Sequence, residues 1–176
     1  DIAEYIAVTI KHRCIPYFTP VAGYRYDQTS GKTRLIGCET ALQQFYDYVA
    51  VRSCQEIWDR RLVLQQCSSI KGRGQLYGVK LIKSYVDRDN QAAIYARKHH
   101  QRYNRKCKYF AKLDLKKCYP SIDKALFLRL FEHDCGNPDI IYLWREMLDA
   151  HGRINTSEPY TGLLIGALPS QWAAQF

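Results

Sequence analysis

The sequence lacks the features that mark membrane-spanning and secreted proteins. No stretch approaches 18 consecutive apolar residues, which is about the length that a transmembrane helix needs. The first four residues, Asp1 to Glu4, do not form the basic lead and apolar run of a secretion signal. We therefore expect a cytoplasmic protein with no membrane partner.

Cysteine motifs are also absent. The seven cysteines are an odd number, lie far apart and form no CxxC pair or Cys/His cluster with the spacing of a zinc site. Reduced and mostly buried thiols are the expectation. His99 and His100 are adjacent, and adjacent residues do not share a helix face, so this pair predicts no metal site either.

Acidic residues are scarce in one segment of the chain. Between Arg97 and Lys117, nine Lys or Arg residues accompany one acid, Asp114, so this stretch carries +8 of the net charge of +9. Charge concentrated in this way and interleaved with aromatic residues is typical of a phosphate-binding surface. A solvated basic helix and turn is the alternative, and the single acid inside the run favours the functional interpretation.

The periodicity of apolar residues predicts an α+β chain in which helices predominate. We expect helices at residues 2–13, 40–58, 75–86, 90–103, 121–133, 138–150 and from 170 onward. The expected inner face of the second helix consists of Leu42, Phe45, Tyr46, Val49 and Trp58.

Two segments favour β structure. Residues 22–26 and 33–37 flank a polar stretch and predict a hairpin with its tip at 27–32. Residues 108–115 alternate between apolar and polar side chains and predict a strand. Gln66 to Gly74 is expected to be a loop, because it is rich in Ser and Gly.

The most specific stretch is YFAKLDLKKCYPSID, residues 109–123. Phe110, Leu113 and Leu115 predict a buried strand, and Asp114 stands at its end. A carboxylate in that position is either a salt-bridged structural residue or a ligand of a hard cation such as Mg²⁺. For an isolated acid the structural role is the commoner one.

This stretch resembles motif A of the reverse transcriptases, in particular those of bacterial group II introns, retrons and diversity-generating retroelements. The resemblance implies that Asp114 is the catalytic ligand of Mg²⁺ or Mn²⁺ and that the backbone carbonyl of Leu115 joins it. The backbone N–H groups of Lys117 and Cys118 are expected to face the nucleotide triphosphate. The ring of Tyr119 is expected to lie under the sugar and to exclude a 2′-hydroxyl, so that dNTPs are accepted and rNTPs rejected. A core tyrosine before a proline turn is the alternative.

A second stretch, GLLIGALPSQW at residues 162–172, resembles motif B of the same enzymes. The resemblance implies that the backbone at Ile165 and Gly166 approaches the nascent base pair, and that a Cβ atom at position 166 would collide with it. Ser170 is expected to cap the following helix, and Gln171 to lie near the template strand. Motifs A and B in this order are more specific together than either is alone.

Two upstream segments fit the same family. Lys32 and Arg34, on the predicted hairpin, are expected to contact the β- and γ-phosphates, and the planar guanidinium of Arg34 suits bidentate binding. The loop at residues 66–75 resembles the fingers loop of bacterial enzymes that ends in Gly-Arg-Gly, which implies template contacts for Lys71 and Arg73. For both segments an ordinary charged surface loop is the alternative.

The resemblance implies a right-hand polymerase, with fingers at residues 1–107 and a partial palm with short antiparallel strands at 108–176. The implied activity is RNA-directed DNA synthesis, and the partners are an RNA template, a DNA or RNA primer and dNTPs. The family's motif C, Tyr-x-Asp-Asp, is missing, and Asp87-Arg88-Asp89, in an expected polar turn, cannot replace it. We expect a longer parent protein to supply the C-terminal remainder of the palm and the thumb, and the 176-residue chain alone to be inactive.

Other functions remain open at this point. A catalytically incomplete polymerase domain could serve as an RNA-binding module, and a defence-associated polymerase of the same fold would carry the same motifs. The sequence leaves the lineage, the accessory proteins and the oligomeric state open.

Overall fold

The computed structural model describes residues 1–154 and 161–176. Packing divides the chain into two compact units: unit 1 comprises residues 1–62 and 116–176, and unit 2 comprises residues 63–115. The described residues form an α+β chain that is mostly helical, as the sequence predicts, and they contain one two-stranded antiparallel sheet. The division by packing differs from the predicted boundary between fingers and palm at residue 107, which stays a prediction.

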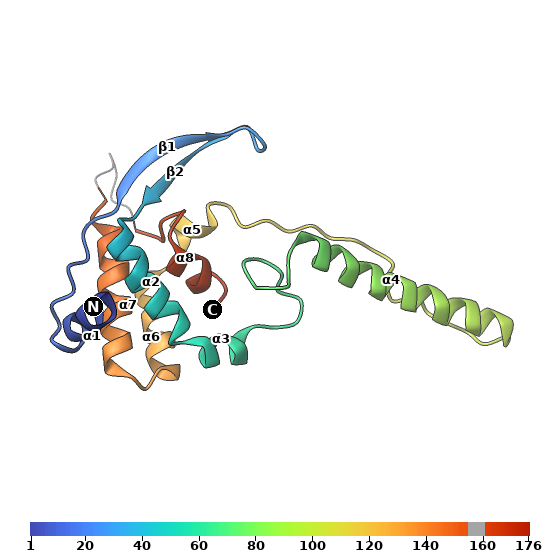
Figure 1. Ribbon diagram of the computed structural model, residues 1–176. Helices are drawn as coiled ribbons and strands as arrows, with labels where there is room; N and C mark the ends of the chain where they lie inside the picture. The colour runs from blue at the N-terminus through green and yellow to red at the C-terminus, as the bar shows by residue number, and fades with distance from the viewer. Residues whose placement is uncertain (155–160) are drawn as a thin grey trace. The chain divides into compact units, whose positions relative to one another are not determined.

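Unit 1 contains the sheet and most of the helices (Figure 1). Its elements are α1 (Ile2–Lys11), β1 (Val21–Asp27), β2 (Lys32–Cys38), α2 (Ala41–Arg52), α3 (Gln55–Arg61), α5 (Cys118–Ser121), α6 (Lys124–Asp134), α7 (Pro138–Gly152) and α8 (Leu168–Ala173). Unit 2 contains one long helix, α4 (Gln75–Lys98), with irregular segments before and after it.

An aromatic cluster forms the core of unit 1. Trp58, Phe131 and Trp144 are buried, and their ring centroids lie 5.4–5.9 Å apart. The indole N–H of Trp58 donates to the carbonyl of Val51 at 2.8 Å, which satisfies its one polar group. Burial of each large aromatic side chain contributes about 2–3 kcal/mol, so this cluster is the main apolar contribution to the packing of α3, α6 and α7.

The predicted hairpin is confirmed. Strands β1 and β2 pair in register from Val21 opposite Cys38 to Asp27 opposite Lys32. At the tip, the carboxylate of Asp27 accepts hydrogen bonds from the backbone N–H groups of Thr29 and Ser30. Gly31 has a positive φ of 65°, which the tight turn requires and which glycine adopts without strain.

The predicted helix at 40–58 is divided into α2 and α3. Thr40 and Gln43 form a reciprocal capping box at the start of α2. The hydroxyl of Ser53 donates to the carbonyl of Val49 at 2.6 Å, and this side-chain bond favours the end of the helix there. The expected inner face is also partly wrong, because Phe45 is 46% exposed while Gln43 is buried.

Two later helices do not begin at the expected residues, 121 and 170. Ser121 lies inside the short helix α5, and α6 begins after Asp123, whose carboxylate accepts from the N–H groups of residues 125 and 126. Ser170 lies inside α8, whose N-cap is Ala167. The expected start of α7 is confirmed, because Asn137 caps it directly before Pro138.

Unit 2 differs most from expectation. The two predicted helices at 75–86 and 90–103 are one helix, α4, and the expected polar turn at Asp87-Arg88-Asp89 lies within it. Lys83 and Asp87 form an ion pair of 3.0 Å along its surface, at the i and i+4 spacing that stabilises helices. No Gly or Pro interrupts the sequence there, so the polar residues do not end the helix.

The strand predicted at residues 108–115 does not form. The segment is irregular, and Tyr109, Phe110 and Leu113 are at least 80% exposed. The only sheet among the described residues is the hairpin of unit 1, so no strand pairs with this segment. An alternating pattern fixes which side chains share a face, whereas a strand also needs a hydrogen-bonding neighbour.

The cysteines are free thiols, as expected, but they are not mostly buried. Cys54 and Cys135 are buried, whereas Cys14, Cys38 and Cys107 are exposed. Among the described residues, no helix combines the length and the apolar character that crossing a membrane requires.

Candidate functional site

Three segments that are far apart in the sequence meet in unit 1. They are the base of the hairpin at residues 36–38, the turn at residues 162–166, called here the motif B turn, and Tyr119 at the end of motif A. Backbone hydrogen bonds join all three. The junction contains three of the seven residues that the sequence assigns to nucleotide binding, namely Tyr119, Ile165 and Gly166.

Tyr119 contacts the motif B turn through its backbone. The N–H of Leu163 donates to the carbonyl of Tyr119 at 2.9 Å. Gly162 lies so close to the backbone of Pro120 that a Cβ atom at this position would overlap with it. The ring of Tyr119 is half-buried, and burial raises the pKa of its hydroxyl. Glycine at 162 therefore permits the close approach that joins motif A to motif B.

The base of the hairpin contacts the same turn. The N–H of Gly37 donates to the carbonyl of Ile165 at 2.8 Å, and Ile36 pairs with Ile165 in a parallel β-bridge. Gly166 has a φ of 111°, and a Cβ atom there would lie 2.7 Å from the carbonyl oxygen of Gly37. Only glycine tolerates both this backbone conformation and this contact. Contact between Gly166 and a base pair stays a prediction. The exclusion of a Cβ atom at this position, however, is a property of this structure.

A cavity of about 460 Å³ opens beside the junction. Its lining includes Gly37 and Gly166 from the junction and Gln44, Asp47 and Tyr48 from α2. Cys38, Glu39 and Leu168 complete the lining. The wall from α2 is polar, and its one buried ionisable residue is Asp47.

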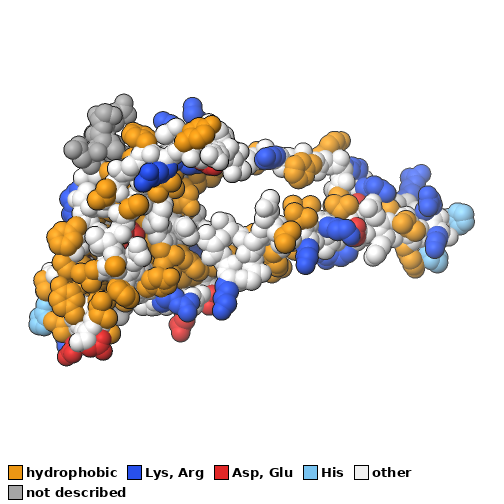
Figure 2. Space-filling view, turned by 45° about the horizontal axis from the view of Figure 1, so that its top comes forward, with side chains coloured by type: hydrophobic (Ala, Val, Ile, Leu, Met, Phe, Trp, Pro, Cys, Tyr) orange, Lys and Arg blue, Asp and Glu red, His pale blue; other side chains and the backbone are white. Residues whose placement is uncertain are grey.

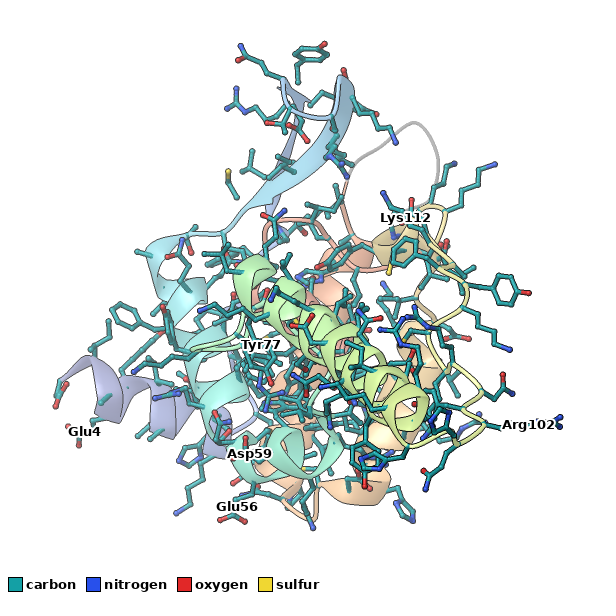
Figure 3. The ribbon with its side chains drawn as sticks, turned by 90° about the vertical axis from the view of Figure 1, so that its right-hand side faces the viewer. Glu4, Glu56, Asp59, Tyr77, Arg102 and Lys112 are labelled. Atoms are coloured by element: carbon teal, nitrogen blue, oxygen red, sulfur yellow. The ribbon has the colours of Figure 1, made fainter. Side chains whose placement is uncertain are left out.

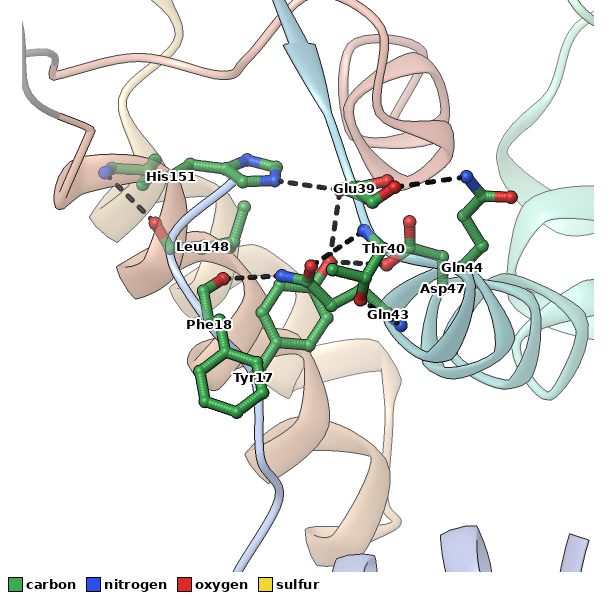
Figure 4. A network of polar contacts seen from close by, with 10 residues as sticks. Tyr17, Phe18, Glu39, Thr40, Gln43, Gln44, Asp47, Leu148 and His151 are labelled. Carbon is green, nitrogen blue, oxygen red and sulfur yellow. Dashed lines mark hydrogen bonds and ion pairs between the residues drawn. The ribbon is translucent and has the colours of Figure 1, made fainter. Parts of the chain in front are cut away.

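Asp47 belongs to a buried polar network that the sequence analysis did not anticipate (Figure 4). The hydroxyl of Tyr17 lies 2.7 Å from Asp47 Oδ1 and 3.1 Å from Glu39 Oε1, and it donates to this carboxyl pair. His151 Nε2 lies 3.6 Å from Glu39 Oε1 on the opposite side. The network thus joins the end of β2 to α2, to α7 and to the segment that follows α1.

The two carboxyl groups of this network differ in their affinity for a proton. Burial, together with the adjacent charge of Glu39, raises the pKa of Asp47 to about 9. Burial alone would raise the pKa of Glu39, but its interactions with His151, Asp47 and Tyr17 outweigh burial and lower that pKa. Asp47 is therefore the protonated member of the pair at neutral pH, and Glu39 carries the charge.

Lys32 and Arg34 are exposed on β2. The guanidinium of Arg34 lies 3.5 Å from Asp27 Oδ2 and donates from Nη2 to the Ser30 hydroxyl at 3.4 Å. The hydroxyl of Ser30 also donates to Asp27, and this bond, with weaker help from Arg34, lowers the pKa of the Asp27 carboxyl. Arg34 is thus held at the hairpin tip by two long contacts that an incoming anion could replace.

The other predicted residues of unit 1 have mixed environments. Lys117 is exposed and adopts a left-handed conformation with φ of 52°, directly before Cys118 begins α5. Ser170 is buried, and its hydroxyl has no hydrogen-bond partner among the described residues. Gln171 is half-buried, and its carbonyl accepts from the Gln175 side chain at 2.9 Å. The buried position of Ser170 places its side chain in the packing of α8 and not at the surface.

Four predicted residues lie in unit 2. Asp114 and Leu115 are exposed in the irregular segment, and no hydrogen bond or ion pair of the described residues involves the Asp114 carboxylate. Lys71 is exposed. Arg73 donates to the carbonyls of residues 63 and 66 at 2.9 and 3.4 Å, so its guanidinium holds the loop that precedes α4.

The predicted metal site is incomplete among the described residues. The carboxylate of Asp114 and the carbonyl of Leu115 are hard oxygen ligands of the kind that Mg²⁺ prefers. Within the part of the chain that the structure describes, no three or more His, Cys, Asp or Glu residues gather closely enough to hold a metal ion. These residues therefore provide at most a part of a two-metal centre, and we derive no reaction step through a metal here.

No family model matches the sequence, and no curated protein matches it.

Apolar periodicity does not predict the buried polar network of Tyr17, Glu39, Asp47 and His151. Gln43 and Asp47 share the inner face of α2 with Tyr46, but a hydrophobicity pattern assigns polar residues to the solvent side. The local signal for their burial is the spacing of Gln43, Tyr46 and Asp47 at i, i+3 and i+4, together with the capping box at Thr40.

Proposed function

We propose that this chain forms the fingers and part of the palm of a reverse transcriptase, an RNA-directed DNA polymerase. The observation that carries the proposal is the junction in unit 1, where the hairpin base, the motif B turn and Tyr119 are joined by backbone hydrogen bonds. The resemblance assigns nucleotide binding to Tyr119, to Ile165 and Gly166 of the motif B turn, and to Lys32 and Arg34 farther along the hairpin. Contact among the three segments brings motifs A and B together in the fold, which the order of the motifs in the sequence does not by itself require.

Tyr119 would select the sugar. Its ring is half-buried, and its backbone is fixed by the bond from Leu163. A ring held rigidly under C2′ excludes a hydroxyl by steric overlap, whereas a mobile side chain would move aside. The close approach at Gly162 supports this rigidity, because it brings the backbone of Pro120 against the motif B turn.

Lys32 and Arg34 would bind the triphosphate. Both are exposed on β2, whose base is joined to the motif B turn through Gly37 and Ile165. The contacts of Arg34 with Asp27 and Ser30 are long, at 3.5 and 3.4 Å, and a bidentate phosphate contact would be stronger than either. The backbone N–H of Lys117, an exposed residue, would lie toward the same phosphates.

Asp114 would be the first ligand of Mg²⁺ or Mn²⁺. Its exposed carboxylate has no partner among the described residues, which supports the ligand role over that of a salt-bridged structural residue. When bound, the metal would stabilise the charge that develops on the transferred phosphoryl group. We propose that a longer parent protein supplies the remaining carboxylates, and that the 176-residue chain alone is inactive.

The test is incorporation of dNTPs and rNTPs on a primed RNA template, with Mg²⁺ or Mn²⁺, by the full-length parent protein. The variant is Asp114→Ala, and the matched control is Asp87→Ala, which removes a half-buried aspartate of unit 2 that pairs with Lys83. We expect incorporation of dNTPs by the wild type and the control, and loss of at least about a thousandfold in Asp114→Ala.

Two outcomes would overturn the proposal. Equal incorporation by Asp114→Ala and wild type would remove the assigned ligand. Tight RNA binding without any incorporation by the parent protein would instead identify a binding module built on a polymerase fold.

A further inference from the structure

The net charge of the chain lies entirely in unit 2. Residues 63–115 contain twelve Lys or Arg and three Asp residues, which gives +9. Unit 1 contains fourteen basic and fourteen acidic residues, so its formal charge is zero. A charge of this size in about 50 residues is destabilising through self-repulsion unless an anion neutralises it.

Five of these cations lie in the last turn of α4 and in the segment that follows it. They are Arg97, Lys98, Arg102, Arg105 and Lys106, called here the distal basic surface. All five are exposed, and none forms an ion pair among the described residues. Figure 2 shows Lys and Arg side chains gathered over this part of unit 2.

The distal basic surface is far from the predicted template contacts. Lys71 and Arg73 precede the first residue of α4, whereas the distal basic surface begins in its last turn. Lys106 lies beside Asp89, which is 14 residues after the first residue of α4 and thus about 21 Å along the helix. A nucleic acid would therefore reach the two groups of cations through different phosphates.

Asp89 fixes the shape of the distal basic surface. It is buried in the middle of α4, and its Oδ1 accepts from the Tyr103 hydroxyl at 2.9 Å and from the Lys106 N–H at 2.8 Å. Its Oδ2 accepts from the Cys107 N–H at 3.4 Å. These bonds hold residues 99–107, called here the return segment, along the helix that they have just left (Figure 1).

The bonds to Asp89 leave the basic side chains of the return segment free for other contacts. Asp89 is occupied by backbone and tyrosine donors, so it does not pair with the guanidinium groups beside it. In Figure 3 the side chain of Arg102 extends away from the return segment toward solvent. A buried acid thus orders a basic surface without neutralising its exposed charges by direct contact.

An exposed aromatic pair completes the distal surface. The ring of Tyr95, which is 60% exposed, lies 4.2 Å from the ring of His99 between centroids. Aromatic side chains beside cations are the usual platform for unpaired bases, because every base can stack on a ring. This pair favours a single-stranded ligand over a duplex, in which the bases already stack on one another.

We propose that the distal basic surface, with Tyr95 and His99, is a second binding site for single-stranded nucleic acid, and that Asp89 positions it. The cations would contact successive phosphates, and the aromatic pair would stack with a base. The site does not depend on the polymerase activity proposed above, since it involves none of the residues of that proposal.

The test is the affinity of the protein for a fluorescent single-stranded RNA 20-mer, measured by anisotropy over a range of salt concentrations. One variant replaces Arg102, Arg105 and Lys106 with Gln, and the control replaces Lys11, Arg52 and Arg129, three exposed cations of unit 1, with Gln. We expect the first variant to bind about tenfold or more weakly, with the slope of log K against log salt reduced by about two. The control, with the same net charge, is expected to change less than about twofold.

Asp89→Ala separates positioning from net charge. This variant gains one positive charge, so an effect of total charge would strengthen binding. If Asp89 positions the return segment, binding weakens instead, and Asp89→Asn, which keeps an acceptor oxygen, weakens it less. Circular dichroism checks that α4 stays helical in each variant.

The outcomes are distinct from those of the polymerase test. Equal losses in the two triple variants, or tighter binding by Asp89→Ala, would overturn the assigned site. A single-stranded DNA of the same sequence determines whether the site prefers RNA, and a duplex that binds more tightly than either strand would contradict the stacking role. Asp114→Ala is expected to bind as the wild type does, whatever its effect on incorporation.

Discussion

The backbone N–H of Leu163 donates to the carbonyl oxygen of Tyr119 at 2.9 Å, although 44 positions separate the two residues in the chain. This bond joins the residue that we assign to sugar selection to the turn that resembles motif B. The predictions below test this junction and the buried network beside it.

Gly162 is the described glycine at which an added methyl group would lie closest to backbone atoms. In Gly162→Ala the new Cβ overlaps with the backbone of Pro120, and backbone moves less readily than a side chain. We expect the midpoint of thermal unfolding to fall, with a loss of about 1–3 kcal/mol in the free energy of unfolding. Gly136→Ala is the control, because nothing lies within 4 Å of its Cβ position. Equal stability of the two variants would show that motifs A and B are not packed as described.

Gly37 and Leu164 are expected to be energetically coupled. A Cβ atom at Gly37 would overlap with the side chain of Leu164, so Gly37→Ala forces this leucine to move. Leu164→Ala makes room for the methyl group, and the double variant is therefore expected to be more stable than the sum of the single losses by about 0.5–3 kcal/mol. Denaturant unfolding of the four proteins gives this coupling energy. The same cycle with Gly23→Ala, which has open space around it, should be additive.

Tyr119→Ala is expected to relax the choice of sugar in the proposed polymerase. Removal of the ring opens the space beside C2′, so the ratio of rNTP to dNTP incorporation by the parent protein should rise by roughly tenfold or more. Tyr119→Phe keeps the ring and serves as the control. If both variants retain the wild-type ratio, Tyr119 is a core tyrosine that precedes a proline turn.

The buried Asp47 carboxyl predicts a dependence of stability on pH. Its pKa is raised to about 9 in the folded chain, whereas an unfolded aspartate ionises near pH 4. Between these values the unfolded state loses its proton and the folded state keeps it, so this group makes the protein less stable as the pH rises from about 4 to about 9.

Asp47→Asn removes this titration and still accepts from Tyr17. Its unfolding midpoint is therefore expected to decline less than that of the wild type between pH 5 and pH 9, as measured by thermal melts across the range. Glu56→Gln, on the exposed surface of α3, should follow the wild type. Parallel curves for all three proteins would mean that Asp47 is ionised in the folded chain.

The elements that local chemistry specifies were predictable from the sequence. The hairpin follows from two β-prone runs around a polar tip, and the start of α7 follows from Asn137 before Pro138. The strand at 108–115 was wrong because strand formation depends on a neighbour that the local sequence does not identify. Helix α4 was divided wrongly because charged residues in its middle resembled a turn, although they are compatible with a helix.

The candidate site was predictable only where residue type determines conformation. Gly166 was identified as a position that excludes a Cβ atom, and its φ of 111° agrees. The network around Glu39 and Asp47 depends on contacts with Tyr17 and His151, which lie far away in the sequence, and the local signal in α2 does not identify these partners. Ser170 was assigned to a cap because serine favours caps, whereas tertiary packing buries it within α8.

Unit 1 is assembled from two stretches of chain that residues 63–115 separate. Its core can therefore form only after the intervening segment has closed as a loop during folding. The entropy of closure changes with the logarithm of loop length, so moderate insertions or deletions in this segment should alter the refolding rate of unit 1 only slightly. A single break in the backbone of the segment has a larger consequence, because it makes the folding of unit 1 a bimolecular reaction whose rate depends on protein concentration.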